Sequence, residues 1–196
     1  MKRKRKIIVY IATSADGYIA RADGSVDWLN RPRTAGNYHM AAFFRSIDTI
    51  LWGRKTFEPM LAKGSKGGGF GMKVKNYVFS HRPPPSAAPD VEFVNEPVGA
   101  FAQRLRAQPG KDIWMMGGAG LIASFLDAGE IDAFIIHVIP VFIGEGIPLV
   151  QARHRLVPLE LRSARRFADG VVRLHYEVRR QAGAARQRAK KRAARR

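Results

Sequence analysis

The stretch WMMGGAGL, residues 114–121, has the residue types best suited to phosphate binding. An apolar run ends there in Gly117 and Gly118, and a helical pattern follows directly. Glycines at such a junction let main-chain N–H groups approach a pyrophosphate, and the positive end of the helix dipole favours its charge. Gly118, Gly120 and Ala123 also fit the dinucleotide-binding pattern GxGxxA. A tight strand-to-helix turn without a ligand explains the same residues.

Two further apolar runs end in cations or hydroxyl groups. In LWGRKTFE, Arg54 can hold a phosphate through two parallel N–H groups and Lys55 adds a point charge. Thr56 can cap the helix or donate to a phosphate. In YVFSHR, residues 77–82, Ser80 offers another hydroxyl beside two basic side chains. A capped surface helix with solvated charges is the alternative for the first of these runs.

The hydrophobic pattern indicates that each of these groups directly follows a buried strand, and that all of them belong to one α/β domain. Strands alternate with helices as far as residue 126, and strands then dominate. Helices are expected at 38–46, 54–61, 98–107 and 119–126, and late strands at 131–143, 156–167 and 171–178. This order predicts a mixed sheet with helices on both faces. The three phosphate-binding groups would then meet at one sheet edge, around an elongated polyphosphate ligand.

The charge of this 196-residue chain is concentrated at its ends. The net charge is +18, from 34 Lys+Arg against 16 Asp+Glu, and there is no Cys. Residues 2–6 and 179–196 carry 14 of the basic side chains, so residues 7–178 hold 20 against all 16 acids. We therefore predict a basic extension at 1–6, a single domain at 7–178, and a basic, disordered tail at 179–196. The tail could contact nucleic acid nonspecifically or act only as a solubilising segment.

Composition also excludes several classes of protein. The lack of Cys rules out a disulfide scaffold and a thiolate metal site, and no metal site is expected. The longest apolar run, residues 133–143, is too short to span a membrane. No cleavage site follows the short apolar stretch near the N-terminus. We therefore expect a cytoplasmic protein.

Several motifs together carry a family resemblance. IIVYIATSADGYIA, WGRKTFE, YVFSHR, IWMMGGAGLIASFL and FIIHVIPVFIGEGIPLV occur in this order, between residue 7 and about residue 178. In this the chain resembles the dihydrofolate reductase superfamily, in the branch that contains the C-terminal reductase domain of bacterial riboflavin biosynthesis. The resemblance implies a dihydrofolate reductase-like mixed sheet of about eight strands, NADPH as hydride donor, and a homodimer.

The resemblance also implies a set of cofactor-binding residues. Arg54 would hold the adenosine 2′-phosphate, and the main chain of Ala12 and Ile19 would fix the nicotinamide carboxamide. The remaining members would surround the 2′-phosphate or the pyrophosphate. The full set is Ala12, Ile19, Gly53, Arg54, Lys55, Thr56, Ser80, His81, Gly117, Gly118, Ala119, Gly120 and Leu121.

Folate-reducing members of the superfamily have catalytic groups that this chain does not match. Their acid in the first helix corresponds to a position near Asn37, and their threonine in the late strand to Ile136. Their tyrosine after the glycine turn corresponds to Ile122. A pterin reductase needs a proton as well as a hydride, and no matched group supplies one. Folate reduction is therefore not predicted.

The catalytic residue stays open, with two carboxylates as candidates. Asp27, beside Trp28, could face the substrate or could be a turn residue. For Asp16, in the SADG turn, a loop-shaping role is preferred. His137, in an apolar stretch, is expected to be a core histidine with a hydrogen-bond partner.

Three functional hypotheses follow. The first is an NADPH-dependent reductase that transfers hydride to a small heterocycle, imine or carbonyl, more like the riboflavin-pathway reductase than a folate reductase. The second is a nucleic-acid-associated protein that uses its basic tail. The third is a member of the superfamily that binds the cofactor without turnover.

Overall fold

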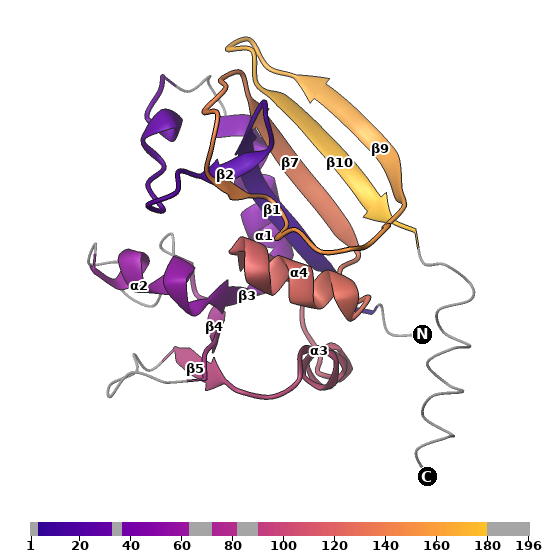
Figure 1. The fold of residues 1–196 in the computed structure, drawn as a ribbon. Helices are drawn as coiled ribbons and strands as arrows, with labels where there is room; N and C mark the ends of the chain where they lie inside the picture. The colour runs from indigo at the N-terminus through magenta and orange to yellow at the C-terminus, as the bar shows by residue number, and fades with distance from the viewer. Residues whose placement is uncertain (1–3, 33–36, 63–71, 82–89, 180–196) are drawn as a thin grey trace.

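A computed structural model describes residues 4–32, 37–62, 72–81 and 90–179, and its main feature is one eight-stranded sheet (Figure 1). The strand order is β5-β4-β3-β6-β1-β7-β10-β9, and β2 pairs with β8 in a separate two-stranded sheet. The strands are β1 (Ile7–Ser14), β2 (Tyr18–Ala20), β3 (Ile47–Gly53), β4 (Lys75–Phe79), β5 (Val91–Val94), β6 (Asp112–Gly117), β7 (Ala133–Ile139), β8 (Ile147–Pro148), β9 (Leu159–Arg166) and β10 (Val172–Val178). The helices are α1 (Met40–Ser46), α2 (Arg54–Ala62), α3 (Val98–Ala107) and α4 (Ala119–Asp127), with short 3-10 turns η1 (Asp27–Leu29) and η2 (Asn37–His39).

The sheet is mixed, as the sequence predicted. From β5 to β7 all neighbouring strands are parallel, while β10 is antiparallel to both β7 and β9. Parallel strands covered on both faces need side chains that are apolar on both sides, which explains the continuous run IIVY at the start of β1. The carboxyl ends of the parallel strands therefore lie at one edge of the sheet.

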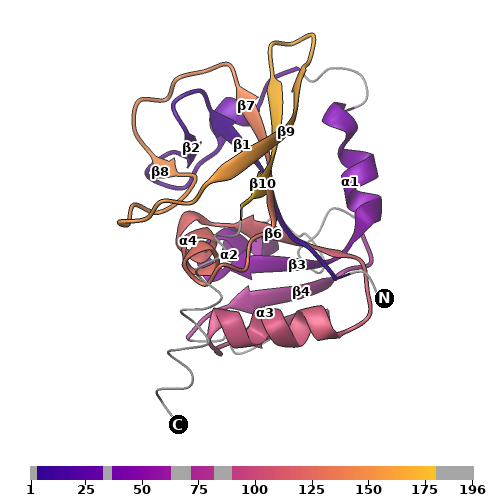
Figure 2. The same ribbon diagram turned by 90° about the vertical axis from the view of Figure 1, so that its right-hand side faces the viewer.

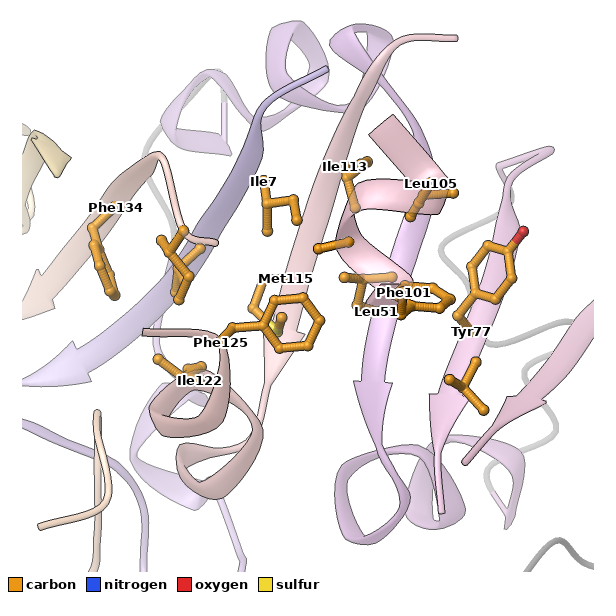
Figure 3. Close-up of a cluster of buried hydrophobic side chains, with 14 residues drawn as sticks. Ile7, Leu51, Tyr77, Phe101, Leu105, Ile113, Met115, Ile122, Phe125 and Phe134 are labelled. Atoms are coloured by element: carbon orange, nitrogen blue, oxygen red, sulfur yellow. The ribbon is translucent and has the colours of Figure 1, made fainter. Parts of the chain in front are cut away.

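Helices cover both faces of the sheet, and alternate residues of β1 point into the two cores. Ile7 and Val9 pack with α3 and α4, in the cluster shown in Figure 3. Ile8 and Tyr10 pack on the other face, against α1 and α2. Figure 2 shows α1 on the opposite side of the sheet from α3. The expected arrangement of helices on both faces is confirmed.

Several predicted elements were too long, among them the strand expected at 156–167, which is observed as β9. The late strand was expected to reach residue 143, but β7 ends at Ile139 because Pro140 has no N–H for the ladder and a tight turn follows, with Val141 N–H donating to the Ile139 carbonyl. The first helix was expected to begin at Tyr38, but it begins at Met40. Tyr38 and His39 have positive φ angles of 56° and 63°, which a right-handed helix excludes.

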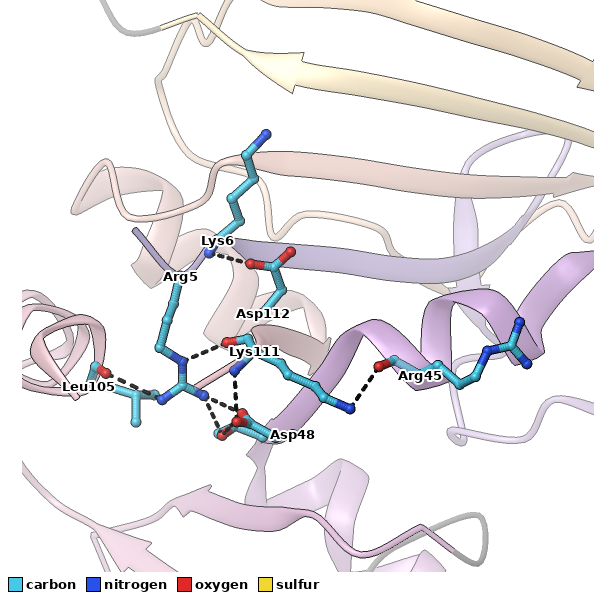
Figure 4. Close-up of polar contacts among 8 residues, drawn as sticks. Arg5, Lys6, Arg45, Asp48, Leu105, Lys111 and Asp112 are labelled. Carbon is cyan, nitrogen blue, oxygen red and sulfur yellow. Dashed lines mark hydrogen bonds and ion pairs between the residues drawn. The ribbon is translucent and has the colours of Figure 1, made fainter. Parts of the chain in front are cut away.

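The N-terminal segment contacts the domain from Arg5 onward, although residues 1–6 were grouped as an extension. Arg5 is buried, and its guanidinium donates to the Lys111 carbonyl (2.6 Å), to Thr49 Oγ1 (2.8 Å) and to the Asp48 carboxylate (Figure 4). Asp48 also accepts from the Lys111 main-chain N–H at 2.8 Å. This network joins the chain before β1 to the starts of β3 and β6.

The predicted basic tail lies outside the described residues beyond Arg179, and its disorder stays a prediction. Within the described ranges, no helix combines the length and the apolar character needed to cross a bilayer. The cytoplasmic location also stays a prediction.

Candidate cofactor-binding site

The structure brings the three predicted phosphate-binding turns together at one edge of the sheet. β4, β3 and β6 are adjacent and parallel, with Gly53 opposite Phe79 and Trp52 opposite Gly117. The residues that follow these strands, Arg54, Ser80 and Gly118, therefore emerge side by side. In open α/β sheets, ligands bind at the carboxyl ends of the strands, which is where these three residues lie.

The main chain of the β3 turn approaches the main chain of the β6 turn closely. A β-carbon on Gly53 would lie 3.4 Å from both the Gly117 oxygen and the Gly118 nitrogen. A β-carbon on Gly118 would lie 3.1 Å from Thr56 Oγ1. The Gly117–Gly118 peptide bond is cis. Because Gly53, Gly117 and Gly118 carry no side chains, the surface here consists of peptide groups and the Thr56 hydroxyl, which a phosphate can approach.

Helix α4 directs its N-terminus at the same surface. Its N-cap is Gly118, in an extended conformation, and no side chain caps the helix. The first N–H groups of a helix have no partner within it, and they carry the positive end of its dipole. These donors, the bare glycine main chain and the Thr56 hydroxyl form an arrangement that fits a pyrophosphate.

Of the predicted 2′-phosphate residues, Arg54 and His81 are exposed and Ser80 is partly buried. Arg54 Nε lies 3.3 Å from Glu58 Oε1, one helical turn further on, and both side chains are about half exposed. An exposed ion pair of this kind contributes little to stability, so Arg54 can exchange it for a phosphate. On the next strand, Ser80 N–H donates to the Val94 carbonyl, and His81 Nδ1 lies 2.7 Å from Asn95 Oδ1.

The other half of the predicted set lies on β1 and β2. Ala12 is in β1, opposite His137 of β7, and Ile19 is in the short strand β2. The segment after β8 joins this half to the glycine turn, because Leu149 N–H donates to the Gly17 carbonyl at 3.0 Å and Gln151 N–H to the Ala119 carbonyl at 3.4 Å. One continuous segment therefore spans from the β1–β2 turn to the start of α4.

Asp16 organises a loop. Its carboxylate accepts hydrogen bonds from the main-chain N–H groups of Ile143 (3.1 Å) and Gly144 (2.8 Å). Hydrogen bonds from the Ser14 hydroxyl, Gly144 and Ile143 lower the pKa of Asp16. A carboxylate held ionised in this way ties the β1–β2 turn to the loop after β7, which agrees with the preferred loop-shaping role.

Asp27, the other catalytic candidate, forms an exposed ion pair. Arg21 donates to its two oxygens at 2.6 and 3.0 Å, and the Asp27 side chain is 57% exposed. The hydrogen bonds from Arg21 lower the pKa of Asp27. The site therefore holds Asp27 as an anion at the surface, a poor state for a proton donor near neutral pH.

A buried polar cluster on the α1 face of β1 and β7 was not recognised from the sequence. Tyr10 Oη lies 3.5 Å from His137 Nε2, and the rings of Tyr38 and Phe167 flank the imidazole. The Tyr38 hydroxyl donates to the carboxylate of Asp169, in the β9–β10 turn. The continuous apolar run of β7 indicates that His137 is buried, but it could not identify these partners.

Burial keeps His137 and Tyr10 uncharged. It lowers the pKa of His137 to about 4, with a smaller contribution from Arg173, and it raises the pKa of Tyr10 to about 12. His137 also hydrogen-bonds the Ile11 main chain. His137 is therefore a core histidine with partners, as expected.

In β7, the residue matched to the threonine of folate-reducing members does not face α1. Ile136, matched to their threonine, packs against the core beneath α3 and α4. The first helix, which carries the matched acid, lies on the opposite face, where His137 is the adjacent β7 residue. Ile122, in α4, is fully buried in the hydrophobic core. The side chain of Asn37 lies outside the described part of the structure.

The comparison with protein families is decisive. A sequence model of the RibD C-terminal domain matches residues 5–173. The chain belongs to the RibD C-terminal domain family. Among its relatives is the Bacillus subtilis (strain 168) protein YwjB, 38% identical over 174 residues that cover 88% of this chain and 98% of YwjB. The resemblance to this branch is thereby confirmed.

Solved structures of the same architecture extend the comparison. A putative riboflavin biosynthesis protein from Shewanella sp. PV-4 superposes with a TM-score of 0.78 at 25% identity, covering 89% of this chain and 99% of that one. Dihydrofolate reductase from Enterococcus faecalis, solved with NADP(H), superposes with a TM-score of 0.63 at 14% identity, covering 89% and 97%. This RibD-type chain therefore has the dihydrofolate reductase fold and a reductase-like architecture.

Proposed function

We propose that this protein is an NADPH-dependent reductase that transfers hydride to a small heterocyclic, imine or carbonyl substrate. The observation that carries the proposal is the meeting of Arg54, Thr56 and Gly118 at the carboxyl edge of β3 and β6. Membership of the RibD C-terminal domain family and the dihydrofolate reductase fold, known with NADP(H) bound in the Enterococcus enzyme, support it.

Different residues at this edge bind different parts of the dinucleotide. Arg54 binds the 2′-phosphate, with Ser80 and His81 on the same side. Thr56 and the start of α4 bind the pyrophosphate, and their donors are fixed before the ligand arrives. NADPH supplies the hydride, while the chain orients the dinucleotide across the strand ends.

The nicotinamide half of the dinucleotide lies against β1. The main chain of Ala12 and Ile19 fixes the carboxamide, and the Asp16 hydrogen bonds hold the connecting loop in place. Trp28 packs with Ala12 in a third apolar cluster, which shields this end from water. We assign no proton transfer to Asp16 or Asp27, because hydrogen bonds lower both of their pKa values.

We also propose that the protein is a homodimer. β9 is an edge strand, and it exposes Leu159 and Leu161, at 42% and 53%. Leu156, just before it, is 85% exposed. Exposed leucines gathered along an edge strand favour association of two copies, since burial removes apolar surface from water.

Titration of the full chain with NADPH and NADH, followed by thermal unfolding, tests the function. A ligand at a hundred times its Kd adds about 2.7 kcal/mol of stability. NADPH should therefore raise the unfolding temperature at a much lower concentration than NADH does. Oxidation of bound NADPH by a panel of heterocyclic, imine and carbonyl compounds then separates a reductase from a protein that binds the cofactor without turnover. Absence of any shift at millimolar NADPH would leave the nucleic-acid hypothesis, which deletion of residues 179–196 tests by the loss of salt-sensitive binding.

A further inference from the structure

A cavity lies on the α1 face of the sheet, away from the ends of β3, β4 and β6. It occupies about 250 Å³ between α1 and the strands β1, β7 and β10. Its wall includes Tyr10, Phe43 and Ile135 on the apolar side and His39, Arg173 and His175 on the polar side. None of the described residues that line it is a carboxylate. The cavity therefore pairs an apolar floor with basic side chains.

The floor of the cavity is aromatic. The rings of Tyr10 and Phe43 stack with their centroids 4.1 Å apart and their planes 16° apart. Trp114 packs edge-on against both rings and donates its indole N–H to the Tyr10 carbonyl at 2.9 Å. A fixed aromatic surface of this kind suits a small apolar or aromatic body.

Arg173 is the unusual residue of this cavity. It is only partly exposed, yet no hydrogen bond or ion pair of its guanidinium occurs within the described residues. The other described arginines that are buried or partly buried all donate to carboxylate or main-chain oxygens: Arg5, Arg21, Arg31, Arg106 and Arg155. None of its nitrogens is fully buried, so the guanidinium contacts solvent and can donate to an anion that enters the cavity.

The charged groups near Arg173 do not neutralise its guanidinium. Its positive charge contributes to lowering the pKa of His137, and burial together with nearby cations lowers the pKa of His175. The nearest acid on β10, Glu177, is already bonded to Lys6 (3.1 Å) and to Arg162 (2.6 and 3.0 Å). Among the described residues, no carboxylate forms an ion pair with Arg173.

We propose that this cavity binds a small apolar molecule that carries an anionic group, a carboxylate or a phosphate. Arg173 holds the anion through two parallel N–H groups, and the Tyr10–Phe43 stack supports the apolar body. The ligand enters beside the exposed residue Ala42 of α1. The site is separate from the edge proposed for NADPH, so it stands whether or not that function holds.

Calorimetric titration of the full chain with three probes tests this site. The probes are benzoate, phenyl phosphate and neutral benzyl alcohol, each titrated without NADPH. At least one of the two anions should bind at least about tenfold more tightly than benzyl alcohol, because a charged hydrogen bond contributes more than a neutral one. The stronger anion identifies the class of ligand. Equal binding of all three probes, or no binding at millimolar concentration, overturns the proposal.

Two variants and a matched control locate the binding. Arg173→Gln should weaken the preferred anion at least about tenfold, whereas Arg166→Gln removes the same charge from an exposed residue of β9 and should leave binding unchanged. Ala42→Phe places a ring at the cavity mouth from an exposed helix position and should block binding with the fold intact. If Arg173→Gln fails to fold, Ala42→Phe decides. Anion binding that survives Ala42→Phe, or that weakens equally in Arg166→Gln, contradicts the assignment.

Discussion

Thr56 Oγ1 lies 3.1 Å from the point that a β-carbon on Gly118 would occupy, although Thr56 follows β3 and Gly118 follows β6. The side-chain hydroxyl and the bare peptide groups thus share one surface. That contact joins two motifs that are far apart in the sequence into a single candidate phosphate site.

Gly118→Ala should weaken NADPH binding by at least about tenfold, since the new methyl group crowds Thr56 and covers main-chain donors at the start of α4. Fluorescence titration with NADPH measures the change. Gly99→Ala is the matched control, because nothing lies within 4 Å of a β-carbon at that position of α3. If the two variants bind NADPH equally well, the glycine turn is not part of the cofactor site.

Arg5→Met should lower the free energy of unfolding by about 3 kcal/mol, because it leaves Asp48 and the Lys111 carbonyl without their buried donor. Urea denaturation at pH 7 measures this change. Arg45→Gln removes an equal charge from an exposed position of α1 and should change stability by less than about 0.5 kcal/mol. A loss below about 1 kcal/mol in Arg5→Met would show that residues 4–6 act only as an extension.

The stability of the fold should fall between pH 6.5 and pH 4 because of His137. Burial lowers the pKa of His137 from 6.5 to about 4 in the folded state, so the unfolded chain binds the proton first as the pH falls. The loss reaches about 3 kcal/mol at pH 4, since each pKa unit corresponds to about 1.4 kcal/mol. Urea denaturation at several pH values should show this slope in the wild type and not in His137→Gln.

The exposed residue His154 supplies the control for that experiment. His154→Gln should keep the wild-type slope between pH 6.5 and pH 4. If His137→Gln and the wild type lose stability in parallel, His137 is not the group that titrates.

Leu161→Glu should convert the proposed homodimer into a monomer, because it places a charge on the apolar edge strand β9. Light scattering after gel filtration measures the mass. Ser163→Glu, at another exposed position of β9, should remain dimeric. A wild-type protein that is monomeric at all concentrations would contradict the proposal directly.

The order of the main-sheet strands and of the four helices could be predicted from the sequence because most buried strands are local apolar runs bounded by turn-forming, polar or charged residues. The short strands β2 and β8 were not predicted. The meeting of Arg54, Ser80 and Gly118 followed from one further rule, that parallel strands share their carboxyl edge. The position of His137 could not be assigned in this way. A one-residue error in register reverses the face of every side chain, and only the pairing of β7 with β1 shows that His137, and not Ile136, faces α1.

Contacts between residues distant in the sequence could not be predicted either. Arg5 belongs by composition to a basic run, and nothing local indicates that Asp48 and Lys111 surround it. Tyr38 and Asp169 meet because the β9–β10 turn reaches the start of α1, which is a property of the fold as a whole.

The most direct test of the proposed function is the ratio of NADPH to NADH affinity in Arg54→Gln and in its control Arg45→Gln. The 2′-phosphate is the only difference between the two dinucleotides, so an arginine that binds it affects NADPH alone. Arg54→Gln should weaken NADPH at least about tenfold and leave NADH nearly unchanged, while Arg45→Gln should leave both unchanged. Equal affinities of the wild type for NADPH and NADH, or an equal loss of both in Arg54→Gln, would contradict the account.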